Sequence, residues 1–170
     1  NKLCMLLLAT GIGLFSCAEK ELPKEYTDSV NVFIGTGGRG HTFPGATLPH
    51  GMVQLSPDTR LFGWDACSGY YYDDTSIMGF SHTHLSGTGI GDYGDILFMP
   101  VVGEKPLIAG TAEKPDEGYR SRFSHEQESA RPGYYQVLLQ DDSINVELTA
   151  TLRAGLHLSL IHISEPTRPY

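Results

Sequence analysis

The segment at residues 64–72 contains the residue types best suited to binding a small polar molecule. It combines the indole of Trp64 with three successive tyrosines, and it places Asp65 and Cys67 between them. Flat aromatic faces pack against the C–H surfaces of sugars, while carboxylates and hydroxyls bond to sugar hydroxyl groups. We interpret this segment as a carbohydrate-contact loop, with core packing as the alternative for the tyrosines. No base is fixed beside Cys67 by sequence, so its thiol is interpreted as buried and structural rather than nucleophilic.

Two histidines, His82 and His84, are separated by one residue in a predicted strand. Positions i and i+2 share one face of a strand, so both imidazoles are expected on the same side, a spacing that zinc can use. No third ligand is evident close by in the sequence, and two imidazoles can donate hydrogen bonds to a substrate without any metal. Substrate contact is the favoured hypothesis, and a small zinc protein is the alternative.

Two glycine-rich segments have features of binding sites, one for a nucleotide and the other for a metal ion. Residues 35–40 read GTGGRG after a predicted strand and fit the dinucleotide fingerprint, with Asp58 at the distance of a ribose contact. A helix should follow to receive the pyrophosphate, but Pro44 and Pro49 follow instead. We therefore expect no nucleotide partner and a loop that approaches another backbone closely. Residues 87–95 carry acidic oxygens suited to Ca²⁺ but lack the ligand register of an EF-hand, which favours a polar loop.

The N-terminus has the pattern of an exported lipoprotein. An apolar run at residues 3–15 follows Lys2, as in an export signal, and is too short to span a bilayer comfortably. It ends in Leu-Phe-Ser-Cys, which resembles a bacterial lipobox and predicts cleavage before Cys17 and lipidation of its thiol; an ordinary secretory signal is the alternative. We expect a signal peptide over 1–16, a charged tether over 17–25 and an outer-membrane or periplasmic lipoprotein of a Gram-negative bacterium.

Charge and cysteine content argue against two classes of protein, those that bind nucleic acid and those stabilised by a disulfide framework. The 170 residues carry a formal net charge of −8, which argues against nucleic acid as a partner. Of the three cysteines, Cys4 lies in the predicted signal and Cys17 is the predicted lipid site, which leaves only Cys67. A disulfide framework is therefore excluded.

The body of the chain, residues 26–157, predicts an all-β sandwich. Short runs of β-forming residues alternate with turn residues, and no stretch shows sustained helical periodicity. The clearest element is a hairpin with strands at 133–140 and 144–153, in which the apolar residues of the second strand, Ile144 through Leu152, form the core face. The other predicted strands are 30–34, 52–55, 77–81, 96–99 and 119–123, the last with Arg120 and Arg122 on the face opposite Tyr119, Ser121 and Phe123.

Several segments, taken in this order, resemble the N-terminal domain of glycoside hydrolase family 92. Each is a weak motif alone, but the ordered set is specific, and the resemblance covers residues 26–157. The matching segments are residues 33–36, 40–46, 49–58, 69–72, 79–89, 94–97, 128–135 and 147–157.

The resemblance implies an architecture and an activity. Members of the family are Ca²⁺-dependent exo-α-mannosidases that invert the anomeric carbon. They pair an N-terminal β-sandwich of the galactose-mutarotase-like super-sandwich type with a C-terminal (α/α)₆ barrel. Inversion needs one carboxylic acid and one carboxylate with room for water between them. In the family these groups and the carboxylates around the metal come from the barrel, so the resemblance implies an incomplete sandwich, inactive alone, with no catalytic residue or metal ligand assigned here.

The same resemblance implies a mannose-containing glycan as substrate. It places five residues of this chain nearest to that glycan, namely Trp64, Asp65, Cys67, His82 and His84. Many relatives carry tryptophan where this chain has Ala66, which leaves the preferred linkage open. The tail at residues 158–170 departs from the family and resembles translated adaptor sequence, so we expect it to be non-native. A glycan-binding lipoprotein without hydrolytic activity is the alternative function.

Overall fold

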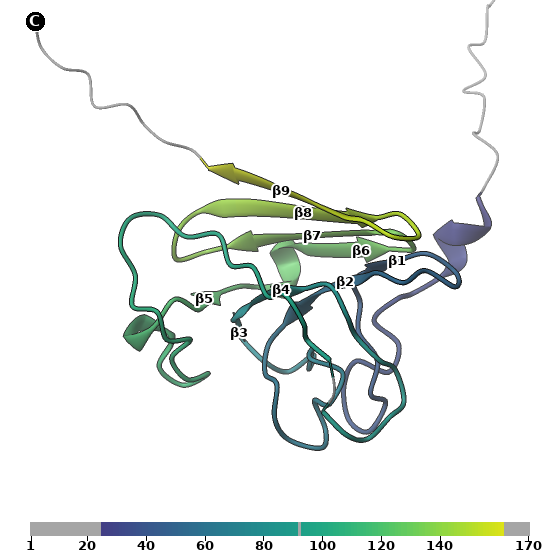
Figure 1. Cartoon of the computed structure of the whole chain (residues 1–170), viewed down its shortest axis with the longest axis horizontal. Coiled ribbons are helices and arrows are strands. Elements are labelled where there is room, and N and C mark those ends of the chain that lie inside the picture. Colours follow the sequence, from purple (N-terminus) through teal and green to yellow (C-terminus); the bar gives the residue numbers. More distant parts are fainter. Residues whose placement is uncertain (1–24, 92, 162–170) are drawn as a thin grey trace, which may run out of the picture.

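The computed structural model describes residues 25–91 and 93–161. The predicted signal peptide, Cys17 and nearly all of the tether lie outside the described residues, as does the end of the predicted tail. The described chain forms nine strands and three short 3₁₀ helices and contains no α-helix, which confirms the all-β prediction (Figure 1). The 3₁₀ helices are η1 (Tyr26–Ser29), η2 (Pro115–Glu117) and η3 (His125–Gln127). No described helix is long and apolar enough to cross a membrane.

The strands form three antiparallel sheets. The first has the order β1-β2-β4, and the second pairs β3 with β5. The third is a meander of β6, β7, β8 and β9. Their bounds are β1 (Ala46–Thr47), β2 (Gln54–Asp58), β3 (Ser76–Ile77), β4 (Gly79–Ser81), β5 (Ser121–Arg122), β6 (Glu128–Arg131), β7 (Tyr134–Leu139), β8 (Ile144–Ala150) and β9 (Gly155–Ile161).

The predicted hairpin is confirmed as β7 and β8. Leu139 pairs with Ile144 at the turn and Tyr134 pairs with Thr149 at the far end. The apolar residues of β8 are buried as far as Ala150, but Leu152, predicted to continue this face, is exposed. Thr151 ends the strand because its backbone N–H and its hydroxyl bond to Ala154, which reverses the chain into β9.

The core lies between the four-stranded sheet and the sheet that contains β1 and β2, as Figure 1 shows. Apolar side chains of β7 and β8 pack here against Leu55 of β2 and Phe80 of β4. Each fully buried side chain of this kind stabilises the fold by about 1.5–3 kcal/mol. The alternation of apolar and polar residues in β7 and β8 therefore determines which face of the meander packs into the core.

Two predicted strands are wrong. Residues 30–34 form turns instead, because the side chain of Asn31 accepts a hydrogen bond from the backbone N–H of Phe33 at 3.0 Å and offers the chain an alternative to a sheet. Residues 96–99 contribute only one bridge, between Phe98 and Phe80. Ile96 has a φ of 58°, which interrupts the extended backbone.

The segment at 119–123 forms the short strand β5, but Arg120 does not face solvent as predicted. Its guanidinium is buried and donates to the hydroxyl of Ser76 at 3.1 Å and to the carbonyl of Thr59. Burial lowers the pKa of Arg120. Arg122 is exposed as expected and pairs with Asp141 at 2.7 Å. Period-two alternation failed because this arginine satisfies buried carbonyls between β2 and β3.

The first glycine-rich segment approaches backbone closely, as predicted. A Cβ at Gly40 would lie 2.1 Å from the carbonyl oxygen of Gly35, and Gly35 accepts the N–H of Thr42 at 3.2 Å. At the other end of the domain, β9 continues past the predicted boundary at His157, and residues 158–161 pair with residues 144–147 of β8. The other edge of β9 has no strand partner among the described residues.

Candidate functional site

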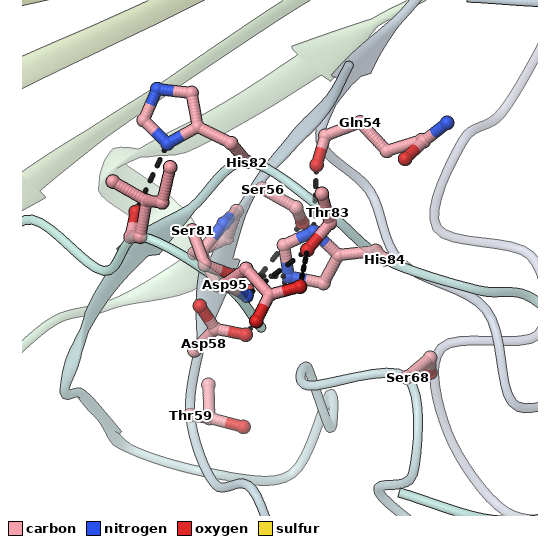
Figure 2. Close-up of polar contacts among 12 residues, drawn as sticks. Gln54, Ser56, Asp58, Thr59, Ser68, Ser81, His82, Thr83, His84 and Asp95 are labelled. Carbon is pink, nitrogen blue, oxygen red and sulfur yellow. Dashed lines mark hydrogen bonds and ion pairs between the residues drawn. The ribbon is translucent and has the colours of Figure 1, made fainter. Parts of the chain in front are cut away.

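A buried histidine and aspartate pair lies at the centre of the candidate site. Asp58 ends β2 and is 0% exposed, and His84 follows β4 and is 3% exposed. The Nε2 of His84 lies 2.9 Å from Oδ1 of Asp58, and its Nδ1 lies 2.7 Å from the carbonyl oxygen of Gln54 (Figure 2). The ring therefore ties both ends of β2 to the segment after β4.

The geometry assigns this pair a positioning role rather than nucleophilic catalysis. Ser81 lies 3.1 Å from Nε2 of His84, the same nitrogen that faces Asp58. A serine nucleophile needs the base and its orienting carboxylate on opposite ring nitrogens. Here Nδ1 faces a backbone carbonyl, so Ser81, His84 and Asp58 do not form a catalytic triad.

His82 points away from His84, contrary to the prediction that they share a face. Its Nδ1 lies 3.0 Å from the carbonyl oxygen of Ile96 and its Nε2 lies 3.2 Å from Nε2 of His157; Figure 2 shows the two rings directed apart. β4 ends at Ser81, so the period-two rule no longer applies to the next three residues. Among residues 25–91 and 93–161, no group of three or more His, Cys, Asp or Glu side chains could hold a metal ion. His82 and His84 therefore do not form the zinc site of the alternative hypothesis.

We expect the contact between His82 and His157 to make stability pH-dependent. Burial, and secondarily the neighbouring His82, lower the pKa of His157 from its ordinary value of 6.5. The unfolded chain then binds this proton more readily than the folded one, so the stabilisation is present above about pH 6.5 and is lost as the pH falls. Thermal melts between about pH 7.5 and 5 should show a smaller acid loss in His157→Gln than in the parent. His50→Gln, which removes an exposed imidazole, provides the control, and an equal change in acid loss in both variants would contradict the assignment to His157.

A small polar cavity of about 60 Å³ brings Cys67 and His84 together with Asp58. Its remaining lining is Leu61, Ser68, Gly69, Gly91, Tyr93 and Gly94. Asp58 Oδ2 is buried and has no hydrogen-bond partner among the described residues. Gly69 has a φ of +89°, and a Cβ there would lie 2.3 Å from Oδ1 of Asp58. Glycine therefore lets the aromatic segment pass directly over the buried pair.

Trp64 and Asp65 lie on the surface, shortly before the cavity residue Cys67 in the chain. Trp64 is 55% exposed, and its ring packs edge to face on that of His41, with centroids 4.4 Å apart. Asp65 lies 3.7 Å from the guanidinium of Arg60, which also binds Asp74 at 2.8 Å and covers the ring of Tyr71 at 4.7 Å. The indole is more than half exposed to a ligand, with the guanidinium of Arg39 6.0 Å from its ring centroid, and Asp65 has Arg60 as its cationic neighbour.

Sequence reasoning missed three residues of this region. His41 and Arg60 support the aromatic segment, and Asp58 was considered only as a ribose ligand. His41 follows a glycine-rich run and has a φ of 54°, so its place beneath Trp64 depends on a turn that no periodicity encodes. The five predicted site residues thus divide into Cys67 and His84 in the cavity, Trp64 and Asp65 on the surface, and His82 in a separate pocket with Phe98 and His157.

Comparisons with known proteins identify the family and agree with the fold. Residues 29–158 match the Glycosyl hydrolase family 92 N-terminal domain. The chain is 53% identical to the family GH92 α-mannosidase BT3965 from Bacteroides thetaiotaomicron over 77% of its own length, with a TM-score of 0.75. That α-mannosidase also appears in a complex with mannoimidazole. A second structure, the GH92 family glycosyl hydrolase ccman5, is 31% identical over 78% of the chain with a TM-score of 0.64.

One further relative has a description that states its location. It is described as an uncharacterized secreted glycosidase from Arthroderma benhamiae and is 32% identical over 160 residues, or 89% of this chain. The chain spans 18% of the two solved structures and 19% of this relative, or about a fifth of each. Because the family match covers most of the described residues, the chain belongs to glycoside hydrolase family 92 and carries the N-terminal β-sandwich domain of that family.

Proposed function

We propose that this chain is the N-terminal, pocket-forming part of an inverting exo-α-mannosidase that hydrolyses mannose-containing glycans. The observation that carries the proposal is the 53% identity to an α-mannosidase over 77% of the chain. The complex of that relative with mannoimidazole, a compound named for mannose, supports the sugar class. Every position matched in that relative lies within about a fifth of its length, so the proposal concerns a protein longer than this chain.

In this proposal the sandwich supplies one wall of the sugar pocket. The exposed indole of Trp64 offers a flat face to a pyranose ring, and Cys67 and His84 line the cavity behind it. The acid and base of an inverting enzyme lie about 6.5–9.5 Å apart, on opposite faces of the sugar. Both are assigned to the barrel domain of the family, so the chain by itself is proposed to be inactive.

The Ca²⁺ ion of the family is proposed to be bound mainly by the barrel domain. The described residues contain no cluster of three or more His, Cys, Asp or Glu side chains suited to a metal ion. Ca²⁺ takes six to eight oxygen ligands, several of them carboxylates. We therefore assign most of its carboxylate ligands to the barrel domain.

Export and anchoring complete the proposal. The relative from Arthroderma benhamiae is named as secreted, which supports export of this chain. The lipobox before Cys17 supports a bilipidated anchor, because two acyl chains hold a protein on a membrane stably where one does not. Globomycin treatment of expressing cells, which blocks signal cleavage of lipoproteins, should leave an uncleaved precursor, as should Cys17→Ala.

The enzyme proposal is tested with the full-length gene product. Incubation with α-mannobiose should release mannose, and proton NMR of the early product should show the β-anomer, as inversion requires. Binding of mannobiose without any release of mannose would favour the alternative, a glycan-binding lipoprotein. Retention of the α-anomer would contradict inversion while leaving the glycosidase assignment intact.

We expect Trp64→Ala to weaken binding of α-mannobiose by about tenfold, because an aromatic platform contributes on the order of 1 kcal/mol beyond its buried area. The KM for α-mannobiose, taken from initial rates of mannose release by the full-length protein, measures the change. Phe62→Ala is the matched control, since Phe62 is a neighbouring exposed aromatic outside the predicted contact set. Equal losses in both variants would indicate a general disturbance of the loop rather than a sugar contact at Trp64.

A further inference from the structure

A buried carboxylate joins the four-stranded sheet to the aromatic segment at residues 63–72. Glu128 begins β6, and its side chain is 1% exposed. Its oxygens accept hydrogen bonds from the hydroxyl of Tyr135 at 2.6 Å and from the hydroxyl of Tyr70 at 3.0 and 3.1 Å. Nδ1 of His125 lies 2.6 Å from its second oxygen. A charge removed this far from water persists only when several donors surround it.

His125 extends the same network to a second tyrosine of the segment. Its Nε2 lies 2.7 Å from the carbonyl oxygen of Tyr72, and its ring stacks on that of Tyr72 with centroids 4.0 Å apart and planes 2° from parallel. Its two ring nitrogens thus face Glu128 on one side and the backbone of Tyr72 on the other. Glu128 thus reaches Tyr70 directly and Tyr72 through His125.

The two tyrosine hydroxyls remain donors in this environment. Burial, reinforced by the nearby Glu128, raises the pKa of Tyr135 well above its ordinary value. Burial also raises the pKa of Tyr70, and Glu128 adds to the shift. A phenol that keeps its proton remains a hydrogen-bond donor above neutral pH.

The anchored tyrosines lie at the end of the segment that carries Trp64. Gly69, just before Tyr70, accepts the backbone N–H of Thr59 at 2.7 Å, and the N–H of Tyr72 donates to Thr36 at 2.9 Å. These backbone bonds hold the segment to its own layer of the sandwich. The side-chain contacts of Glu128 tie it to the opposite, four-stranded sheet.

We propose that Glu128 is a positioning residue for the sugar-contact segment. Its carboxylate holds Tyr70, and through His125 also Tyr72, against β6 and β7, and thereby fixes where residues 63–72 present Trp64. The role in sugar binding rests on the function proposed above, whereas the control of the segment's position does not.

The opposite face of the same sheet offers a matched control. Glu147 of β8 accepts the hydroxyl of Tyr134 of β7 at 2.8 Å, the same tyrosine-to-glutamate bond between strands. Tyr134 pairs with Thr149 and lies on the face away from the core, where no residue of the 63–72 segment bonds to it. Changes at Glu147 therefore test the chemistry of the pair without the connection to the segment.

The chain contains a single tryptophan, so its fluorescence reports Trp64 alone. In this chain, Glu128→Gln should shift the emission and raise acrylamide quenching of Trp64, whereas Glu147→Gln should leave both unchanged. Tyr70→Phe and Tyr134→Phe repeat the comparison with a milder change if Glu128→Gln does not fold. Unchanged Trp64 signals in folded Glu128→Gln and Tyr70→Phe would overturn the proposal, even if both variants were less stable.

The binding arm uses the full-length protein and α-mannobiose, with affinity read as the KM from initial rates of mannose release. Glu128→Gln should weaken binding about tenfold, the size expected when loss of a charged hydrogen-bond partner displaces a contact loop, and Glu147→Gln should not. A moved Trp64 signal with no mannobiose binding by the parent protein would retain Glu128 as a positioning residue and reject the proposed function. Equal affinity of the parent and Glu128→Gln, with Trp64 unmoved, would reject the positioning role and retain the function.

Discussion

Asp58→Ala is expected to destabilise the domain by about 3–5 kcal/mol, because removing one partner of a buried pair leaves the other without compensation. Asp58 is fully buried at the end of β2, and Nε2 of His84 would retain only Ser81 as a neighbour. A loss of this size is a large share of the total stability of about 5–15 kcal/mol of an ordinary domain. Urea denaturation followed by the fluorescence of Trp64 measures it.

An exposed ion pair supplies the control for this prediction. Asp116 lies 2.9 Å from Arg122, with both side chains exposed, and Arg122 keeps its second partner Asp141. Asp116→Ala should therefore change the free energy of unfolding by less than about 1 kcal/mol. If Asp58→Ala were as mild as Asp116→Ala, the pair of Asp58 and His84 would not hold β2 to the segment after β4.

The sequence predicted the parts of the fold that depend on local pattern. The hairpin of β7 and β8 followed from strict alternation between Ile144 and Ala150 and from the polar connection before it, although β7 ends at Leu139, one residue before the predicted end. The alternation failed at Arg120, which is buried because it donates to the carbonyls of Ser76 in β3 and of Thr59 just after β2. A tertiary contact overrode the pattern there, and no local feature of the sequence signals it.

The site was harder to predict because it depends on irregular backbone. Spacing alone placed His82 and His84 on one face, but the strand ends before them and their rings turn to Ile96 and Gln54 in opposite directions. The composition of residues 64–72 did indicate a polar and aromatic surface, and the structure exposes Trp64 there. What composition could not supply is the support beneath it, since Glu128 lies more than fifty residues away in the chain.

Buried polar groups hold the aromatic segment in place. The aromatic segment has no regular secondary structure, so its shape comes from two buried polar groups near its C-terminal end, the pair of Asp58 and His84 beneath Gly69 and the carboxylate of Glu128 behind Tyr70. Each group is costly to bury alone and is stabilised only when its donors are in place. A loop fixed in this way can present side chains as precisely as a strand can.

Gly45→Ala is expected to cost about 3 kcal/mol or more, because the added methyl group would meet backbone rather than a movable side chain. A Cβ at Gly45 would lie 2.2 Å from the carbonyl oxygen of Leu55 and 2.4 Å from Cα of Ser56, both in β2. Relief requires β2 to move away from β1, which opens the layer that carries Asp58. Gly37→Ala is the matched control, since its nearest contact would be an ordinary 3.5 Å to Cβ of Tyr72. Thermal melts of the two variants should differ widely, with Gly37→Ala close to the parent; a similar melting temperature for both would show that the junction between β1 and β2 yields easily.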